Sequence, residues 1–363
     1  KTILKTPYYL SNITEKDTLT FGLDNFGITT RMMNDTVFAK LQWDDKAVED
    51  LNKALVDAYF HPHEKGGIFS ITDGHIRVND SLWQVSPSNF VDFTDGRITL
   101  SNIMFSHNQQ NLRADGYVPM AEGDTLGVQL RQFDISNFDI LFQRWGFNID
   151  GFISGDATIS DMKTNPMLLA DLGITDLGVN GDRIGDAVIE SRWNNPEKSV
   201  DLNVNILNEK RKSLNLYGSY YTARKHNNLD FTVELDSLKL NALSPFLVGV
   251  VSRLQGYGNG LVSITGSLQE PNIDGRLMVK DGGCKVAYLN TFYTFEPTIL
   301  INNKAIKMQN MVLVDTLGNQ AIVDGEIRHN NLKNMELDLR LHPRDFLAIS
   351  RSEERRVGKE CRS

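Results

Sequence analysis

One segment of this chain occurs twice, at a spacing of 105 residues. Residues 133–166 align with residues 238–271 without a gap. Identical residues stand at four positions of the alignment: Gly151 and Gly256, Gly155 and Gly260, Ile159 and Ile264, Pro166 and Pro271. A self-match of this length at a fixed period is typical of repeat proteins, whose stacked units share one continuous core. The sequence therefore predicts an elongated repeat architecture.

The flanking sequence follows nearly the same period. Residues 112–116, 214–218 and 321–325 each place a glycine four residues after an apolar position, and an alternating run follows each of them. We therefore predict four repeats and a tail. They are a partial first repeat at 1–110 with a helical or loop excursion at 45–66, a second at 111–213, a third at 214–320, the start of a truncated fourth at 321–350, and the tail at 351–363.

The tail differs from the rest of the chain. Its thirteen residues include four arginines and show no period of 2 or 3.6. It resembles a translated sequencing adapter, and we expect an artefactual segment that packs on nothing; the alternative is a genuine basic tail. Without Cys361, the remaining cysteine is Cys284, which excludes an internal disulfide and a cysteine-based metal site.

Long stretches alternate apolar and polar residues with a period of two, as in residues 200–206, 229–235, 306–314 and 335–341. This alternation predicts antiparallel strands with one apolar and one solvated face. Candidate helices occur only at 45–59, 137–147 and 242–253, too few to cover the apolar faces. We expect an all-β fold: an elongated, twisted, mostly antiparallel sheet that covers itself by curling into a trough, a sandwich or a barrel.

The apolar half of these alternations is the candidate binding surface. We expect it to share the concave face of the sheet, with these residues: Leu202, Val204, Ile206, Phe231, Val233, Leu235, Val262, Ile264, Met308, Val312, Leu337 and Leu339. Gly256, Gly258 and Gly260 alternate along one strand, which predicts a bend or a close approach there.

Charge and hydropathy argue against a nucleic-acid partner and against a membrane-spanning helix in this sequence. The net charge of −8, without a run of five or more like charges, argues against a nucleic-acid partner. No stretch approaches the ~18 consecutive apolar residues of a membrane-spanning helix. The sequence opens on Lys1 in mid-pattern without an initiator methionine or signal peptide, and we expect both ends to be truncated.

Candidate chemical sites are weak. His61, His63 and Glu64 cluster, but their spacing matches no common metal site, and an exposed loop is favoured. Asp171, Asp176, Asp182 and Asp186 lack calcium-loop spacing and are better explained as turn residues. Residues 257–260 resemble a phosphate cradle only superficially, and no catalytic motif occurs. We expect no enzyme activity, no metal and no cofactor.

Residues 254–277 resemble the repeated β region of the TamB family. The spacing typical of that region is met by Gly256, Gly258, Gly260, Val262, Ile264, Gly266, Leu268, Pro271, Ile273 and Gly275. The first copy departs from it, with Ile153 for the middle glycine and Asp161 at the position of Gly266. The resemblance covers most of residues 60–350, and the asparagine-rich composition is similar to that of Bacteroidetes members.

The resemblance implies an AsmA-like bridge protein of the Gram-negative periplasm with a β-taco-like trough. It implies an N-terminal inner-membrane helix outside this sequence, and an outer-membrane partner of the TamA, Omp85-like kind. An apolar groove would carry phospholipid acyl chains and support outer-membrane protein assembly. One alternative is an extracellular parallel β-helix, as an adhesin, a polysaccharide-binding protein or a lyase, whose rungs repeat every ~20–25 residues. Another is an outer-membrane barrel, which needs aromatic girdles.

Overall fold

The structure is a computed structural model of the 363-residue chain. It describes residues 2–5, 24–44, 53–78, 81–138, 148–162, 167–209, 211–242, 251–268, 270–286, 289–330, 333–343 and 346–347. These residues form antiparallel strands and short 3₁₀ segments, among them the helix Ile135–Phe138, with no α-helix in the described ranges. The predicted all-β, antiparallel fold class is confirmed, whereas the trough and the repeat architecture stay predictions. The tail at 351–363 lies outside the described residues.

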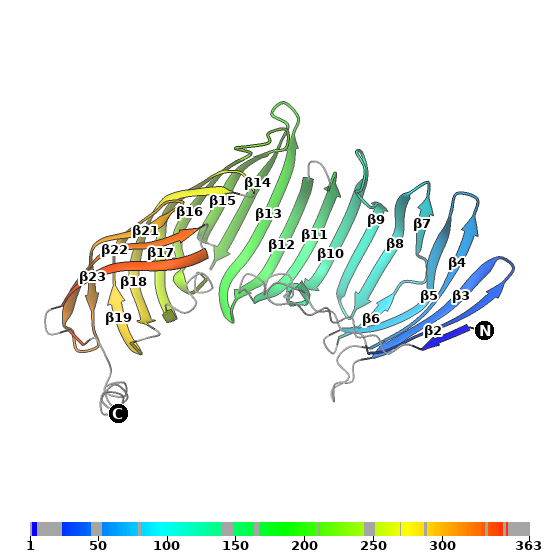
Figure 1. The fold of residues 1–363 in the computed structure, drawn as a ribbon, viewed down its shortest axis with the longest axis horizontal. Helices are drawn as coiled ribbons and strands as arrows, with labels where there is room; N and C mark the ends of the chain where they lie inside the picture. Colours follow the sequence, from blue (N-terminus) through cyan, green and yellow to red (C-terminus); the bar gives the residue numbers. More distant parts are fainter. Residues whose placement is uncertain are drawn as a thin grey trace. The chain divides into compact units, whose positions relative to one another are not determined.

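The chain divides into two compact units. The first comprises residues 1–144 and 151–174, and the second residues 145–150 and 175–363. Within each unit, consecutive strands lie side by side in chain order (Figure 1). This arrangement follows from hairpin connections, since antiparallel neighbours need only short turns.

In the first unit, most strands pair with the strands before and after them. β5 pairs with two short strands in tandem, β6 and β7, and both of these pair with β8. The strands are β1 (Thr2–Lys5), β2 (Asp24–Met33), β3 (Thr36–Asp44), β4 (Lys53–His63), β5 (Gly66–Val78), β6 (Ser81–Val85), β7 (Phe90–Thr94), β8 (Arg97–His107), β9 (Gln110–Tyr117), β10 (Thr125–Asp134), β11 (Ile149–Ser160) and the beginning of β12 (Met167–Val179).

The second unit has the same kind of order. Here β18 pairs with the short strands β19 and β20, and both of these pair with β21. The strands are β13 (Asp182–Asn194), β14 (Ser199–Asn208), β15 (Arg211–Tyr221), β16 (Leu229–Lys239), β17 (Val251–Gly266), β18 (Pro271–Val286), β19 (Thr291–Phe295), β20 (Thr298–Ile301), β21 (Ala305–Val314), β22 (Gln320–Asn330) and β23 (Lys333–Pro343).

The helical or loop excursion expected at residues 45–66, with a candidate helix at 45–59, is wrong from Lys53 onward. Residues 53–63 form β4, which pairs with β3 and β5, and residues 45–52 lie outside the described part. The buried positions are Ala54, Val56 and Ala58, a period of two, whereas Leu55 is 44% exposed. Two of the three inward residues are alanines, so the strand pattern was weak in the sequence and the scattered larger residues suggested a helix.

The other candidate helices are only partly described. The 3₁₀ helix covers the beginning of 137–147, and residues 139–147 lie outside the described part. Of 242–253, residue 242 ends a short 3₁₀ turn, Val251 begins β17, and 243–250 are not described.

A β-bulge occurs at matching positions of the two aligned segments. Gln132 and Ser237, 105 residues apart in the sequence, have φ angles of 45° and 58° and lie where the pairing register shifts. The Gln132 N–H donates to Ser154 Oγ at 2.8 Å, and the Ser237 N–H donates to Asn259 Oδ1 at 2.9 Å. Each bulge thus exposes an amide that the neighbouring strand satisfies with a side chain.

A second pair of bulges uses aspartate in the same way. The N–H of Asn102 donates to Asp115 Oδ1 at 2.6 Å, and the N–H of Asn310 donates to Asp324 Oδ1 at 2.7 Å. Both asparagines have positive φ, at 50° and 49°. The two Asp-Gly pairs at Asp115 and Asp324 therefore support bulges inside strands and do not form hairpin turns.

Backbone proximity explains the recurring glycine. Gly116, Gly218 and Gly325 have φ of 116°, 146° and 144°, which side-chain-bearing residues rarely adopt. A Cβ at Gly218 would lie 2.0 Å from the Asp230 carbonyl oxygen of the next strand. The spacing seen in the sequence thus marks places where two strand backbones approach closely.

Candidate functional site: the apolar face of the sheet

Strand register determines which side chains share a face, because directly opposed residues in paired strands lie on the same side of the sheet. In the second unit, Val204 is opposite Leu216, Leu216 is opposite Val233, and Val233 is opposite Val262. A parallel row joins Leu202, Gly218, Phe231 and Ile264. The apolar positions of β14–β17 thus form one continuous face.

Most of the predicted binding residues lie on this face. Pairing continues it through β18 and β20 to Met308, then through Gly325 to Leu339; position 337 pairs with Ile327, and its side chain is not described. The predicted residues that the register brings together are Leu202, Val204, Ile206, Phe231, Val233, Leu235, Val262, Ile264, Met308, Leu337 and Leu339.

The placement of Val312 on this face is wrong. The register shifts between Met308 and Met311, where Asn310 forms the bulge, so three residues of β21 pass two of β22. Val312 therefore pairs with Ile322 on the opposite face and is 42% exposed. One inserted residue moves every later side chain of the strand to the other face of the sheet, because side chains alternate with a period of two.

The middle of the apolar face is only partly covered. Val200 and Ile206, near the two ends of β14, are 7% and 9% exposed, whereas Leu202 and Val204 between them are half-buried. Further half-buried residues in the middle of the face are Phe231, Val233, Val262 and Ile264. We call these six half-buried residues the central strip. An apolar strip that the described residues leave partly open is a candidate binding surface.

Close packing covers one end of the face. Leu240, just after β16, is 3% exposed and packs with Leu277 and Val279. A Cβ at Gly258 would lie 3.1 Å from Leu240 Cδ2 and 3.0 Å from Leu277 Cδ1, so the glycine leaves room for these leucines. Gly256 lies at a register shift with φ of 108°. The close approach, one of the two outcomes predicted from the alternating glycines, is present.

A second segment packs on the same face near β19. Phe346 stacks on Tyr293 with ring centroids 5.0 Å apart, and the Tyr293 hydroxyl donates to the Leu347 carbonyl at 3.1 Å. Burial raises the pKa of Tyr293. The Leu347 N–H donates to Asp315 at 2.8 Å. Burial acts to raise the pKa of Asp315, but the Leu347 N–H and other backbone N–H donors hold this pKa below its usual value.

The opposite face carries polar networks. Asp201 accepts hydrogen bonds from Ser219 at 2.7 Å, Asn194 at 3.0 Å and Ser199 at 3.1 Å, and the bond from Ser219 contributes most to lowering its pKa. The Tyr217 hydroxyl donates to Glu234 at 3.1 Å, which raises the pKa of Tyr217. The two faces of the same strands thus differ sharply in polarity.

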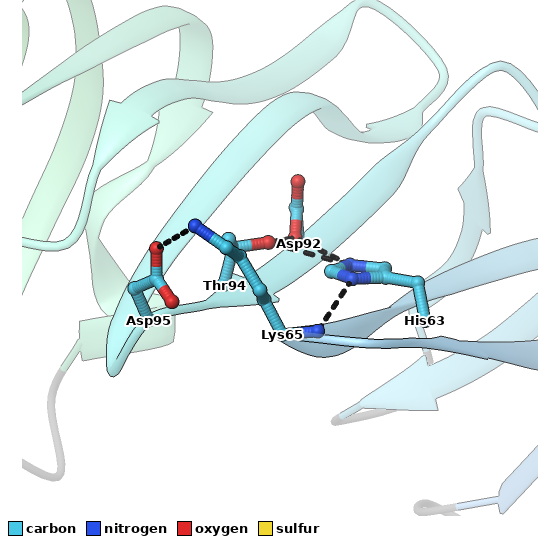
Figure 2. A network of polar contacts seen from close by, with 5 residues as sticks. All are labelled: His63, Lys65, Asp92, Thr94 and Asp95. Atoms are coloured by element: carbon cyan, nitrogen blue, oxygen red, sulfur yellow. Dashed lines mark hydrogen bonds and ion pairs between the residues drawn. The ribbon is translucent and has the colours of Figure 1, made fainter.

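Figure 2 shows the polar contacts of His63, one of the residues considered above as a metal ligand, in the first unit. Its Nδ1 accepts the Lys65 N–H at 3.3 Å, so in the neutral ring Nε2 carries the proton. Nε2 lies 3.3 Å from Thr94 Oγ1 and 3.6 Å from Asp92 Oδ1, and Thr94 also donates to Asp92. Lys65 Nζ lies 3.3 Å from Asp95. The network ties the β4–β5 turn to β7.

Three of the other candidate residues make polar contacts within the protein. His61 Nδ1 lies 2.9 Å from Thr36 Oγ1. Asp176 and Asp186 both pair with Arg183, at 2.8 and 3.4 Å, and Asp186 accepts the Asp176 N–H. Within the described ranges, no group of three or more histidine, cysteine, aspartate or glutamate side chains is placed to hold a metal ion.

Cys284 lies half-buried in β18. Burial raises the pKa of its thiol to about 11, so the nucleophilic thiolate is scarce at neutral pH.

Three features escaped the sequence argument. They are the bulge amides, the ion pair of Arg97 with the 2%-exposed side chain of Asp124, and the covering of the face by Leu240. For the bulges a signal existed: Gln132 and Ser237, like Ser154 and Asn259, are 105 residues apart. Nothing in the sequence points to the pairing of Arg97 with Asp124.

No family model matches the chain, and neither a curated protein nor a solved structure matches it. The strand pairings and the two faces place the chain in a broad structural class: all-β proteins of sequentially paired antiparallel strands with one apolar and one polar face. None of the helices in the described part has the length and hydropathy needed to cross a bilayer.

Proposed function

We propose that this chain is part of a TamB-like bridge protein whose apolar face holds phospholipid acyl chains. The observation that carries the proposal is the central strip, because its six apolar residues from β14, β16 and β17 are only half-buried and are joined into one face through Leu216 and Gly218 of β15. An acyl chain that covers them would gain about 0.8 kcal/mol per buried CH₂ group. These apolar side chains form no hydrogen bonds with a ligand, which suits a surface along which lipids move.

The wider function rests on the sequence resemblance. The proposed protein acts in the periplasm, anchored to the inner membrane, and passes phospholipid towards an outer-membrane partner of the TamA, Omp85-like kind. Support for outer-membrane protein assembly belongs to the same proposal. No catalytic step is proposed, since binding and passage of lipid require none.

The strand pairings argue against the parallel β-helix, the architecture expected under the alternative of an adhesin or a polysaccharide-binding protein. Every described strand pairing is antiparallel, as between β14 and β15, so a parallel β-helix is not the architecture of these residues. Adhesion or polysaccharide binding by the polar face remains the alternative that a lipid-binding experiment distinguishes.

The test places one negative charge on either face. Val233→Asp puts a carboxylate in the central strip, and Thr232→Asp puts one on the opposite face, where Thr232 pairs with Tyr217 and Ser263. A carboxylate beside hydrocarbon costs several kcal/mol because it loses water. We therefore expect Val233→Asp to lose most of its bound phospholipid in native mass spectrometry and Thr232→Asp to keep it.

Circular dichroism must first show that both variants are folded. Ile264→Asp provides a second inward substitution in case Val233→Asp unfolds, since Ile264 is directly opposite Phe231 in the next row. Equal lipid occupancy in all the folded variants, or parent protein without lipid, would contradict the proposal.

A further inference from the structure

The polar face of the second unit contains a hollow of about 830 Å³, bordered by residues of β13, β14, β15 and β16. One cross-strand row of this face runs through it: Glu190 of β13 is directly opposite Asn203 of β14, which is directly opposite Tyr217 of β15. Leu202 also borders the hollow, but its row belongs to the apolar face. The hollow therefore lies on the other side of strands that carry the central strip.

Glu190 brings a carboxylate without a partner to this row. Its side chain is half-buried, and it forms no hydrogen bond or ion pair with any described residue. A carboxylate that has lost part of its water still needs hydrogen-bond donors. Because neighbouring strands lie ~4.8 Å apart, the row from Glu190 to Tyr217 spans roughly 10 Å, about the length of a disaccharide.

Tyr217 provides an aromatic ring at the other end of the row. The residue is 41% exposed, and its hydroxyl donates to Glu234 at 3.1 Å. The same carboxylate accepts from the Asn215 amide at 3.4 Å. These bonds orient the ring from its polar end while the residue stays accessible, so a ligand that contacts the ring has little side-chain freedom to restrict.

The charges around the hollow nearly balance. Two cations, Arg192 and Lys212, face three carboxylates, Glu190, Asp201 and Glu234, which leaves a net charge of −1. A strongly charged ligand of either sign would meet like charges here, and a wholly apolar ligand would cover groups that need hydrogen bonds. The hollow therefore favours a neutral ligand that both donates and accepts hydrogen bonds.

A second hollow of the polar face, between β21 and β23, lacks both features. It has a volume of about 390 Å³, and none of the described residues that border it is aromatic. Its carboxylates already have partners within the protein: Glu326 and Asp338 pair with Arg328 at 2.8 and 2.7 Å. The third, Asp324, accepts the Asn310 N–H. An accessible ring beside an unpartnered carboxylate thus distinguishes the first hollow from the second.

We propose that the hollow over β13–β16 binds a neutral oligosaccharide. A sugar ring has an apolar C–H face, which fits the Tyr217 ring, and a rim of hydroxyls that donate and accept, which fits Glu190 and Asn203. This binding site goes beyond the proposed lipid function and does not depend on it. Saccharide and lipid would occupy opposite faces of the same strands, so one molecule could hold both.

The experiment is isothermal titration calorimetry of the full chain with maltohexaose, cellohexaose and chitohexaose. We expect at least one of these neutral oligosaccharides to bind, and Tyr217→Ala to weaken its binding roughly tenfold. Tyr257→Ala is the matched control. Tyr257 is 40% exposed and lies on the polar face opposite Lys239 and Lys280, but it does not border the hollow, so its loss should leave the affinity unchanged.

Glu190→Gln should also weaken binding roughly tenfold, and it replaces Tyr217→Ala if that variant unfolds. Folded Val233→Asp should keep the saccharide affinity whether or not it loses lipid, so the two proposals fail separately. Three results would overturn the saccharide site: no binding of any of the three oligosaccharides, equal losses in Tyr217→Ala and Tyr257→Ala, or tighter binding of the anionic hexagalacturonate than of every neutral one.

Discussion

Replacing Gly116 by alanine tests whether the recurring glycines exist for backbone proximity. Gly116 has φ of 116°, and a Cβ there would lie 2.4 Å from the Thr125 carbonyl oxygen of β10. The backbone conformation alone costs on the order of 1–3 kcal/mol for a residue with a side chain. The contact adds to this, because 2.4 Å is far inside ordinary van der Waals distance and the obstructing atom is backbone. We expect a loss of roughly 3 kcal/mol in the free energy of unfolding.

The same hairpin provides the matched control. Gly127 lies in β10 opposite Asp115, has no positive φ, and a Cβ there would lie 3.5 Å from the nearest atom, the Asp115 carbonyl oxygen. Gly127→Ala should therefore be neutral or stabilise by about 0.4–1 kcal/mol, through the lower entropy of the unfolded chain. Urea unfolding followed by circular dichroism measures both variants. Equal stabilities of the two variants would refute the argument from close approach.

Two further predictions concern titration. Hydrogen bonds, above all the one from Ser219, lower the pKa of Asp201 in the folded protein. The contribution of Asp201 to stability is therefore complete above its unfolded-state pKa and is lost as pH falls through its folded-state pKa. Asp201→Asn should reduce the loss of stability seen below about pH 4 in acid titrations. Burial raises the pKa of Cys284 to about 11, so its contribution is complete below the unfolded-state value of 9.0 and is lost as pH rises towards 11. In a Cys361→Ser variant, where Cys284 is the only thiol, maleimide labelling at neutral pH should be slow when folded and fast in urea; rapid labelling of the folded protein would show that this thiol is accessible and ionised.

Local alternation was enough to predict several long strands, although not β4, and most of their faces. In β14, β16 and β17 the period of two continues through the central strip, so the six positions from Leu202 to Ile264 could be assigned to one face before any pairing was known. The physical reason is that successive side chains of an extended chain point to opposite sides whatever its neighbours are. Apolar residues on one side then have to share an environment.

Tertiary structure decided what depends on the neighbouring strand. Asn310 forms a bulge because Asp324 of β22 accepts its N–H, and this bulge moves Val312 to the polar face. The strand at Ala54–Ala58 is likewise stabilised by pairing with β3 and β5, since its small side chains carry little pattern of their own. A period of two is a property of a single chain, whereas register, bulges and close approaches belong to pairs of strands, and only the folded sheet specifies them.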